Sequence, residues 1–116
     1  MVFDTGSLSD KRVVGVLVVI EGPLEGQAFA IRDGDNTLGR RDPAGRTDPP
    51  EVNLEGDERV SRQHARIVHN DGTIAIKPLS EKSPTIVNDA RVEDGVELGD
   101  GDTLKLGRTI LRFRSV

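Results

Sequence analysis

The sequence predicts an all-β domain, an antiparallel β-sandwich of about eleven short strands, and three observations lead to this fold class. Short runs rich in Val, Ile and Leu recur along the chain, as in strands that turn alternate side chains toward a core. Clusters of Gly, Pro, Asn and Asp separate these runs at intervals of about ten residues, as turns do in a sandwich. No stretch sustains the apolar spacing of an amphipathic helix.

The length of the chain fits one domain. It has 116 residues, of which 34% are hydrophobic, and this is enough to bury one core without disulfides or metals. The first residues have few large apolar side chains and no period. We therefore expect residues 1–11 to form a flexible N-terminal tail and residues 12–116 to form the domain.

The first three strands are predicted from their side-chain patterns. Val13–Ile20 is β-branched almost throughout, which favours a strand buried on both faces. The side chains of Gln27–Arg32 alternate between two faces, as in a half-buried strand. This strand should pair antiparallel with the first. Asn36–Gly39 is a short strand that leads Arg40 into a loop with three prolines.

The second half of the chain consists of short strand-like runs between turns. The dipeptide Asp71-Gly72 is a strong signal for a tight hairpin between two of these runs. The remaining predicted strands are Glu51–Leu54, His64–Val68, Thr73–Pro78, Thr85–Asn88, Arg91–Val92, Val96–Leu98, Asp102–Leu106 and Thr109–Phe113.

Composition and charge exclude several classes of protein. A net charge of −4 argues against nucleic-acid binding, because affinity for a phosphate backbone needs a basic face. The absence of cysteine excludes a disulfide framework and a thiolate zinc site, and we expect no cofactor and no metal. The apolar run Val13–Ile20 is far shorter than the roughly 20 residues of a membrane span, so we expect no membrane association. No secretory signal precedes this run, and a cytoplasmic location is expected.

Three side chains make up a set of hydrogen-bond donors that suits phosphate. Ser61 offers a hydroxyl, and Arg40 and Arg62 offer guanidinium groups, with no carboxylate in the set. Arginine binds two phosphate oxygens at once through its planar fork. These residues are therefore the candidates for binding a doubly charged phosphoryl group.

The order of these residues resembles that of the forkhead-associated (FHA) domain. Gly39-Arg40, then Ser61-Arg62-Gln63-His64, then Thr85-Ile86-Val87-Asn88 match the family pattern G-R, S-R-x-H and T-x-V-N, and the resemblance extends over roughly residues 13–113. It implies an FHA-like sandwich that binds phosphothreonine peptides through loops at one end.

The resemblance also implies a role for each matching residue. Arg40 would hold the phosphate, the Ser61 hydroxyl would donate to a phosphate oxygen, and Arg62 would lie along the phosphate or the adjacent peptide. Gly39, His64 and Asn88 would support the binding loops from within.

The sequence departs from the family pattern in one loop. Ser83 and Pro84 stand where the family has Asn and Gly, so an amide that holds the peptide backbone is replaced by a shorter hydroxyl. Proline also removes a backbone N–H. Lys82 takes the place of a Ser or Thr that helps to bind phosphate, and it adds a positive charge. These changes predict that phosphate capture persists while peptide selectivity is altered.

Taken together, these residues predict a non-catalytic module that binds a phosphothreonine-containing protein, either a Ser/Thr kinase or one of its substrates. The alternative is a phosphate-independent scaffold with a degenerate pocket, which the change at Ser83 and Pro84 favours. An enzyme is not expected, because no G-x-S-x-G elbow accompanies Ser61. A weaker hypothesis is that phosphorylated Thr5 occupies the pocket of a second copy. The oligomeric state is left open.

Overall fold

The computed structural model describes residues 11–116, which form eleven strands in two sheets. Thr5 and all but the last residue of the expected tail lie outside the described residues. The strands are β1 (Val13–Glu21), β2 (Ala28–Arg32), β3 (Gly34–Gly39), β4 (Val52–Asn53), β5 (Ala65–Asn70), β6 (Thr73–Pro78), β7 (Thr85–Val87), β8 (Ala90–Arg91), β9 (Val96–Glu97), β10 (Thr103–Leu106) and β11 (Thr109–Ser115). The predicted all-β class is confirmed, and each predicted strand overlaps one of these.

The two sheets pack face to face as a sandwich. One sheet has six strands in the order β2-β1-β11-β10-β7-β8, and the other has five in the order β4-β3-β5-β6-β9. Neighbouring strands are antiparallel except β3 and β4, which run parallel. The predicted antiparallel sandwich is confirmed, with this pair as the exception. The long connection between the two strands brings the chain back to the level of Leu38. There β4 begins beside β3 and runs in the same direction.

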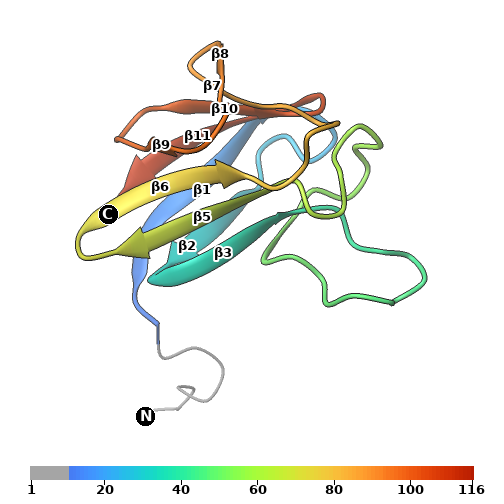
Figure 1. Cartoon of the computed structure of the whole chain (residues 1–116), viewed down its shortest axis with the longest axis horizontal. Coiled ribbons are helices and arrows are strands. Elements are labelled where there is room, and N and C mark those ends of the chain that lie inside the picture. Colours follow the sequence, from blue (N-terminus) through green and yellow to red (C-terminus); the bar gives the residue numbers. More distant parts are fainter. Residues whose placement is uncertain (1–10) are drawn as a thin grey trace.

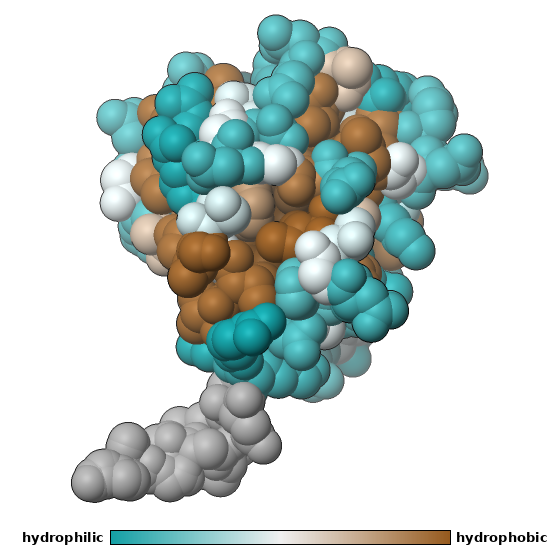
Figure 2. All heavy atoms as spheres, turned by 90° about the vertical axis from the view of Figure 1, so that its left-hand side faces the viewer, coloured by the Kyte–Doolittle hydropathy of each residue, from teal (hydrophilic) through white to brown (hydrophobic). Residues whose placement is uncertain are grey.

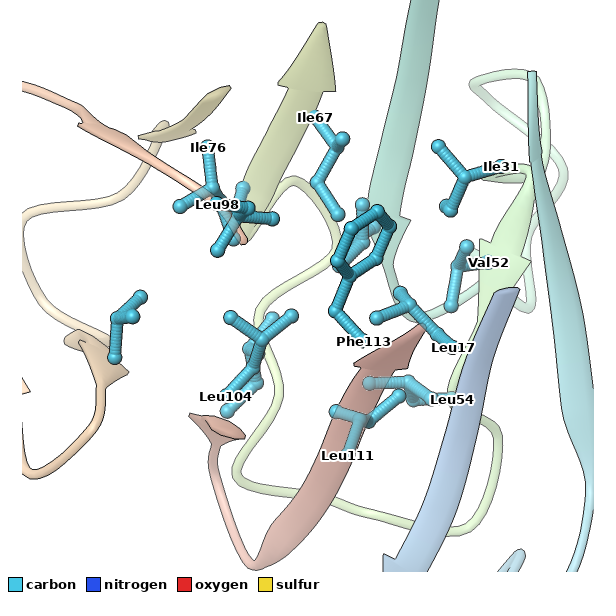
Figure 3. Packing of buried hydrophobic residues seen from close by; sticks show 14 of the residues in the cluster. Leu17, Ile31, Val52, Leu54, Ile67, Ile76, Leu98, Leu104, Leu111 and Phe113 are labelled. Carbon is cyan, nitrogen blue, oxygen red and sulfur yellow. The ribbon is translucent and has the colours of Figure 1, made fainter. Parts of the chain in front are cut away.

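The apolar side of the longer strands faces the space between the sheets. Leu17 and Phe113 from the six-stranded sheet and Leu38, Ile67 and Ile76 from the other are all fully buried. Figure 3 shows side chains from both sheets converging around the Phe113 ring. Burying such side chains stabilises the sandwich by roughly 1.5–3 kcal/mol each, before the cost of ordering the chain.

The prediction that the first strand is buried on both faces is wrong. Leu17 and Val19 are buried, whereas Val16 and Val18 are half-buried and Ile20 is exposed. The six-stranded sheet has only one partner layer, so the second face of β1 turns toward solvent. The β-branched composition reflects strand propensity here rather than burial.

The tight hairpin predicted at Asp71-Gly72 is present between β5 and β6. Both residues have positive φ, +54° and +78°, as a two-residue turn of this kind requires. This hairpin lies at the end of the sandwich opposite the long loops (Figure 1). Figure 2 looks at that end and shows hydrophobic residues exposed between polar ones.

Candidate functional site

Three loops meet at the end of the sandwich away from the β5–β6 hairpin: 40–51 after β3, 54–64 before β5, and 79–84 between β6 and β7. Figure 1 shows them gathered on the right-hand side. Backbone hydrogen bonds join them: the Arg40 amide donates to the Ser61 carbonyl at 3.2 Å, and the Leu79 amide donates to the His64 carbonyl at 3.0 Å. These bonds fix where each loop leaves the sheets.

Gly39 allows the first two loops to approach closely. A Cβ at this position would overlap the Arg62 carbonyl oxygen, and it would lie 2.8 Å from the Arg62 carbonyl carbon and 3.0 Å from the Ser61 oxygen. These are backbone atoms, which cannot rotate away as a flexible side chain can. The glycine before Arg40 is therefore a steric requirement of the loop contact, which agrees with the supporting role implied for it.

The Ser61 hydroxyl lies in a cluster of three serines. It shares a short hydrogen bond with the Ser83 hydroxyl and lies 3.4 Å from the Ser80 hydroxyl. Ser80 in turn accepts the Ser83 amide at 3.2 Å. Two of these residues were predicted from the sequence, and Ser80 was missed. Its position three residues before Ser83 in a polar loop is a weak signal in the sequence.

Arg40 lies beside this cluster with part of its guanidinium engaged. Its Nε donates to the Val60 carbonyl at 3.0 Å, which directs the side chain along the Ser61 loop. Its terminal nitrogens have no hydrogen-bond partner among residues 11–116. Two free N–H groups per nitrogen are therefore available for an anion. The surface hollow that Arg40 lines also includes Glu55 and Glu58, whose negative charges oppose an anion there.

The predicted set of donors had no carboxylate, and the structure places one beside Arg62. A terminal nitrogen of Arg62 lies 3.8 Å from an oxygen of Asp42, which is almost fully buried. Asp42 is held by the Arg46 guanidinium at 2.8 Å, and this hydrogen bond, followed by one from the Ala44 amide, holds the pKa of Asp42 well below its usual range. Arg62 thus has a carboxylate nearby, and a phosphate at Arg62 would have to approach beside it.

His64 connects two of the loops from inside. It is fully buried, its Nδ1 accepts the Ser61 amide at 3.1 Å, and its Nε2 donates to the Pro84 carbonyl at 3.0 Å. This pattern fixes the neutral tautomer with the proton on Nε2. Burial lowers the pKa of His64, with the Pro84 carbonyl and the charge of Asp57 opposing the shift. Both ring nitrogens contact backbone groups and neither contacts the Ser61 hydroxyl.

The remaining predicted residues lie outside the serine cluster. Lys82 lines a hollow beside Ser83 together with Arg59 and Lys105. Asn88, with φ of +49°, closes the turn after β7, and its side chain binds the Thr103 amide and the Asp102 carboxylate, each at 3.0 Å. The structure therefore joins Ser61, Ser83 and the Arg40 backbone, and it places Lys82 to one side.

The described residues were also compared with the patterns of a metal-binding cluster and of a membrane-spanning helix. Residues 11–116 contain no group of three His, Asp or Glu side chains placed to hold a metal ion. The same residues include no helix that is long and apolar enough to cross a bilayer.

Comparison with known proteins places these features in a family. The model of the FHA domain family matches residues 36–107, which contain the whole serine cluster. An FHA domain-containing protein of Arabidopsis thaliana is 33% identical over 93 residues, which make up 78% of this chain and 23% of that protein. The chain thus spans about a quarter of that relative's length.

Solved FHA structures superimpose on the whole sandwich. The FHA domain of an Arabidopsis thaliana hypothetical protein is 30% identical with a TM-score of 0.77, covering 90% of this chain and 86% of that one. A chain from a study of phosphothreonine-dependent FHA domain interactions is 28% identical with a TM-score of 0.71, covering 87% of this chain and 95% of that one.

Proposed function

The chain belongs to the FHA domain family, and from this membership we propose that it binds phosphothreonine in a partner protein through the three joined loops. FHA domains are binding modules, and one solved relative is described by its phosphothreonine-dependent interactions. The observation that carries the proposal here is that the Ser61 and Ser83 hydroxyls meet beside a loop that also holds Arg40, whose amide donates to the Ser61 carbonyl and whose Nε donates to the Val60 carbonyl. The terminal nitrogens of Arg40 have no partner among residues 11–116.

The proposed mechanism is electrostatic. A phosphoryl group brings nearly two negative charges and three acceptor oxygens. The Ser61 and Ser83 hydroxyls would exchange their mutual hydrogen bond for bonds to two of these oxygens, and Arg40 would contact a third. Unphosphorylated threonine offers none of these charges, so docking depends on prior phosphorylation. The Ser/Thr kinase that supplies it, the partner that carries it and a cytoplasmic setting are parts of this proposal.

We infer no catalytic role for the serine. A hydrolase would need a base on the Ser61 hydroxyl, and both nitrogens of His64 are occupied by backbone groups. The hydroxyl itself contacts two other hydroxyls, which do not act as bases at neutral pH.

The central test is a titration of phosphothreonine peptide libraries by fluorescence anisotropy, with matched phosphoserine and unphosphorylated sets. Binding confined to the phosphothreonine set would support the proposal. Arg40→Ala removes two charge-assisted hydrogen bonds, so we expect an affinity loss of about a hundredfold or more. Loss of the Nε bond to Val60 should cost only about 1 kcal/mol of stability.

Arg41→Ala is the matched control, because it removes the same group from the adjacent position. The Arg41 side chain is 56% exposed and pairs with Glu55 at 3.3 Å. We expect near-normal phosphopeptide affinity in this variant. Equal losses in the two variants would mean that the general charge of the loop, and not a bound phosphate at Arg40, explains the binding.

A phosphate-independent scaffold is the second candidate, and specific contacts favour it. A carboxylate, that of Asp42, lies 3.8 Å from Arg62, and Ser83 is shorter than the amide that the family uses. Binding of the partner protein before and after phosphatase treatment separates the two functions, because a scaffold would bind the treated partner equally well.

A further inference from the structure

Strand β2 forms one edge of the six-stranded sheet, and it differs from the other sheet edges in the described chain. Between residues 11 and 116 the two sheets end at β2, β8, β4 and β9, and the last three of these strands have two residues each. β2 has five residues, Ala28–Arg32. Very short edge strands are one way in which proteins prevent a sheet from pairing with another chain. In this part of the chain, β2 is therefore the edge that is long enough to pair with a further strand.

The side chains of β2 leave this edge accessible. Charged side chains, above all Lys, and proline usually protect an open edge. Residues 28–31 contain neither, since their sequence is Ala-Phe-Ala-Ile. Ala28 and Ala30 are exposed, whereas Phe29 is half-buried against the core. A second strand can therefore approach β2 without meeting a charge or a bulky side chain on the outer face.

The pairing of β2 with β1 shows which backbone groups face the open side. In an antiparallel pair, hydrogen-bonded and non-hydrogen-bonded positions alternate. The Val19 amide donates to the Gln27 carbonyl at 2.8 Å, so the odd-numbered residues of β2 bond to β1. The N–H and C=O groups of Ala28, Ala30 and Arg32 therefore point away from β1, toward the edge.

Asn36 closes one end of this edge. Its side-chain oxygen accepts a hydrogen bond from the Arg32 amide, and its side-chain nitrogen donates to the Arg32 carbonyl, each at 2.9 Å. Asn36 is only 2% exposed, so this contact is a fixed part of the turn into β3. Within residues 11–116, the N–H and C=O groups of Ala28 and Ala30 have no such partner. The edge thus presents a donor and an acceptor at each of these two alanines.

We propose that β2 pairs with β2 of a second copy of this chain, antiparallel and around a two-fold axis at Phe29. In this register Ala28 of one copy lies opposite Ala30 of the other, and each such pair exchanges two backbone hydrogen bonds. All the open groups of both edges are then satisfied. The same patch serves on both copies, as in most homodimers. The two six-stranded sheets would form one continuous sheet.

The side chains favour a second copy as the occupant of this edge. The two Phe29 rings would meet at the two-fold axis, in a non-hydrogen-bonded position where opposite side chains lie closest. Charge is complementary at the ends of the strand. Antiparallel pairing brings Arg32 of each copy to the end at which the exposed Glu25 of the other copy lies. One strand therefore supplies both halves of the contact.

This pairing would orient the two phosphate sites in opposite directions. The turn before β2 lies at the same end of the sandwich as the 54–64 loop, because a Cβ at Gly56 would be 3.1 Å from the Pro23 side chain. β2 starts from that end, and antiparallel pairing reverses its direction in the second copy. The dimer would thus bind two phosphorylated partners at once. This consequence rests on the proposed function, whereas the pairing itself does not.

The first test is sedimentation equilibrium of the unphosphorylated full chain, from low micromolar to millimolar concentration. One pair of edge strands buries less than a standard interface of about 1,600 Å², so we expect a weak dimer with a dissociation constant in the high micromolar range. The use of unphosphorylated chain removes any contribution from phosphorylated Thr5. A monomer at every concentration would overturn the inference, and this edge would remain open to a strand of another protein.

Paired charge changes test the register. Ala28→Lys combined with Ala30→Lys places like charges directly opposite each other, whereas Ala28→Glu combined with Ala30→Lys places opposite charges there. We expect the first double variant to weaken the dimer about tenfold and the second to retain or strengthen it. Ala90→Lys is the matched control, because it adds a positive charge on β8, at the other edge of the same sheet. Equal weakening in both double variants, or in the control, would contradict this register.

Amide hydrogen exchange measures the pairing at single residues. The Ala28 and Ala30 amides should gain protection as protein concentration rises, because pairing provides their missing acceptors. The Arg32 amide already binds Asn36 and should exchange at a constant rate. A dimer without added protection at the two alanines would pair through another surface, which would refute the inference. Phosphothreonine peptide titration of the same variants is independent of these outcomes, so the proposed function and the pairing can fail separately.

Discussion

Gly39 shows how one residue controls the distance between two binding loops. Its Cα packs against the Ser61 and Arg62 carbonyl groups, and β3 delivers Arg40 immediately afterwards. Gly39→Ala should push the Ser61 loop away and cost about 1–3 kcal/mol of unfolding free energy, which is typical of overpacking. Phosphopeptide affinity should fall as well, since Arg40 and Ser61 would separate. Urea denaturation and anisotropy titration measure the two effects.

Gly95→Ala is the control for this change. A Cβ at Gly95 would meet the flexible Lys77 side chain at 3.3 Å, and that side chain can move aside. We expect little change in stability and none in affinity. A Gly39→Ala variant that behaves like Gly95→Ala would show that the loops tolerate separation.

The candidate site residues could be named from the sequence, whereas their hydrogen-bond partners could not. Ser61 and His64 belong to a recognisable sequence motif. The hydrogen bond from the Ser61 amide to the His64 ring is seen only in the structure. Asp42 stands in a polar, proline-rich loop and gives no sign of burial in the sequence. Its burial follows from hydrogen bonds within the loop, which hydrophobic periodicity does not detect.

At the scale of the elements, Asp57 connects the 54–64 loop to the turn between β10 and β11. It is 2% exposed, and it binds the Arg108 amide at 2.8 Å and the Thr109 hydroxyl at 2.6 Å. Asp57→Asn replaces one acceptor oxygen with an NH2 group, which cannot accept a hydrogen bond from the amide or the hydroxyl. We therefore expect a loss of about 1–3 kcal/mol of unfolding free energy. Thermal or urea denaturation measures this loss.

Asp57→Asn also removes a negative charge, so the variant needs a control for charge. Asp94→Asn, at an exposed position, controls for the charge change and should leave stability unaltered. Unchanged stability in Asp57→Asn would mean that backbone contacts alone hold the two elements together.

Strand positions were predicted well because each strand is short and bounded by turn residues. The hairpin at Asp71-Gly72 is an example, since both residues must adopt positive φ. Pairing direction was harder to predict. The β3–β4 pair is parallel because of the path of the connecting loop, and a loop's path depends on contacts such as the one at Gly39.

At the scale of the whole molecule, the fold separates charges that the sequence interleaves. Acidic and basic residues alternate closely between Arg40 and Arg66, and a count over this stretch predicts no basic surface. The structure sends Asp42 and Asp57 inward to bind loop donors, and it leaves Arg59 at a surface hollow with Lys82 from the 79–84 loop and Lys105 from β10. Charge balance in sequence is therefore compatible with a local anion site.

The stability of the whole domain should depend on pH through His64. Its pKa is lowered below 6.5 in the folded protein, so the unfolded chain binds a proton first as the pH falls. The unfolding free energy should be constant above about pH 7.5 and then decrease through pH 6.5, by at most about 1.4 kcal/mol per pH unit for one proton. Urea denaturation between pH 7.5 and 5.5 measures this slope. The chain has only two histidines, so His69→Gln is the matched control and should keep the decrease. A flat profile, or a decrease that disappears in His69→Gln, would show that His64 does not cause the pH dependence of stability.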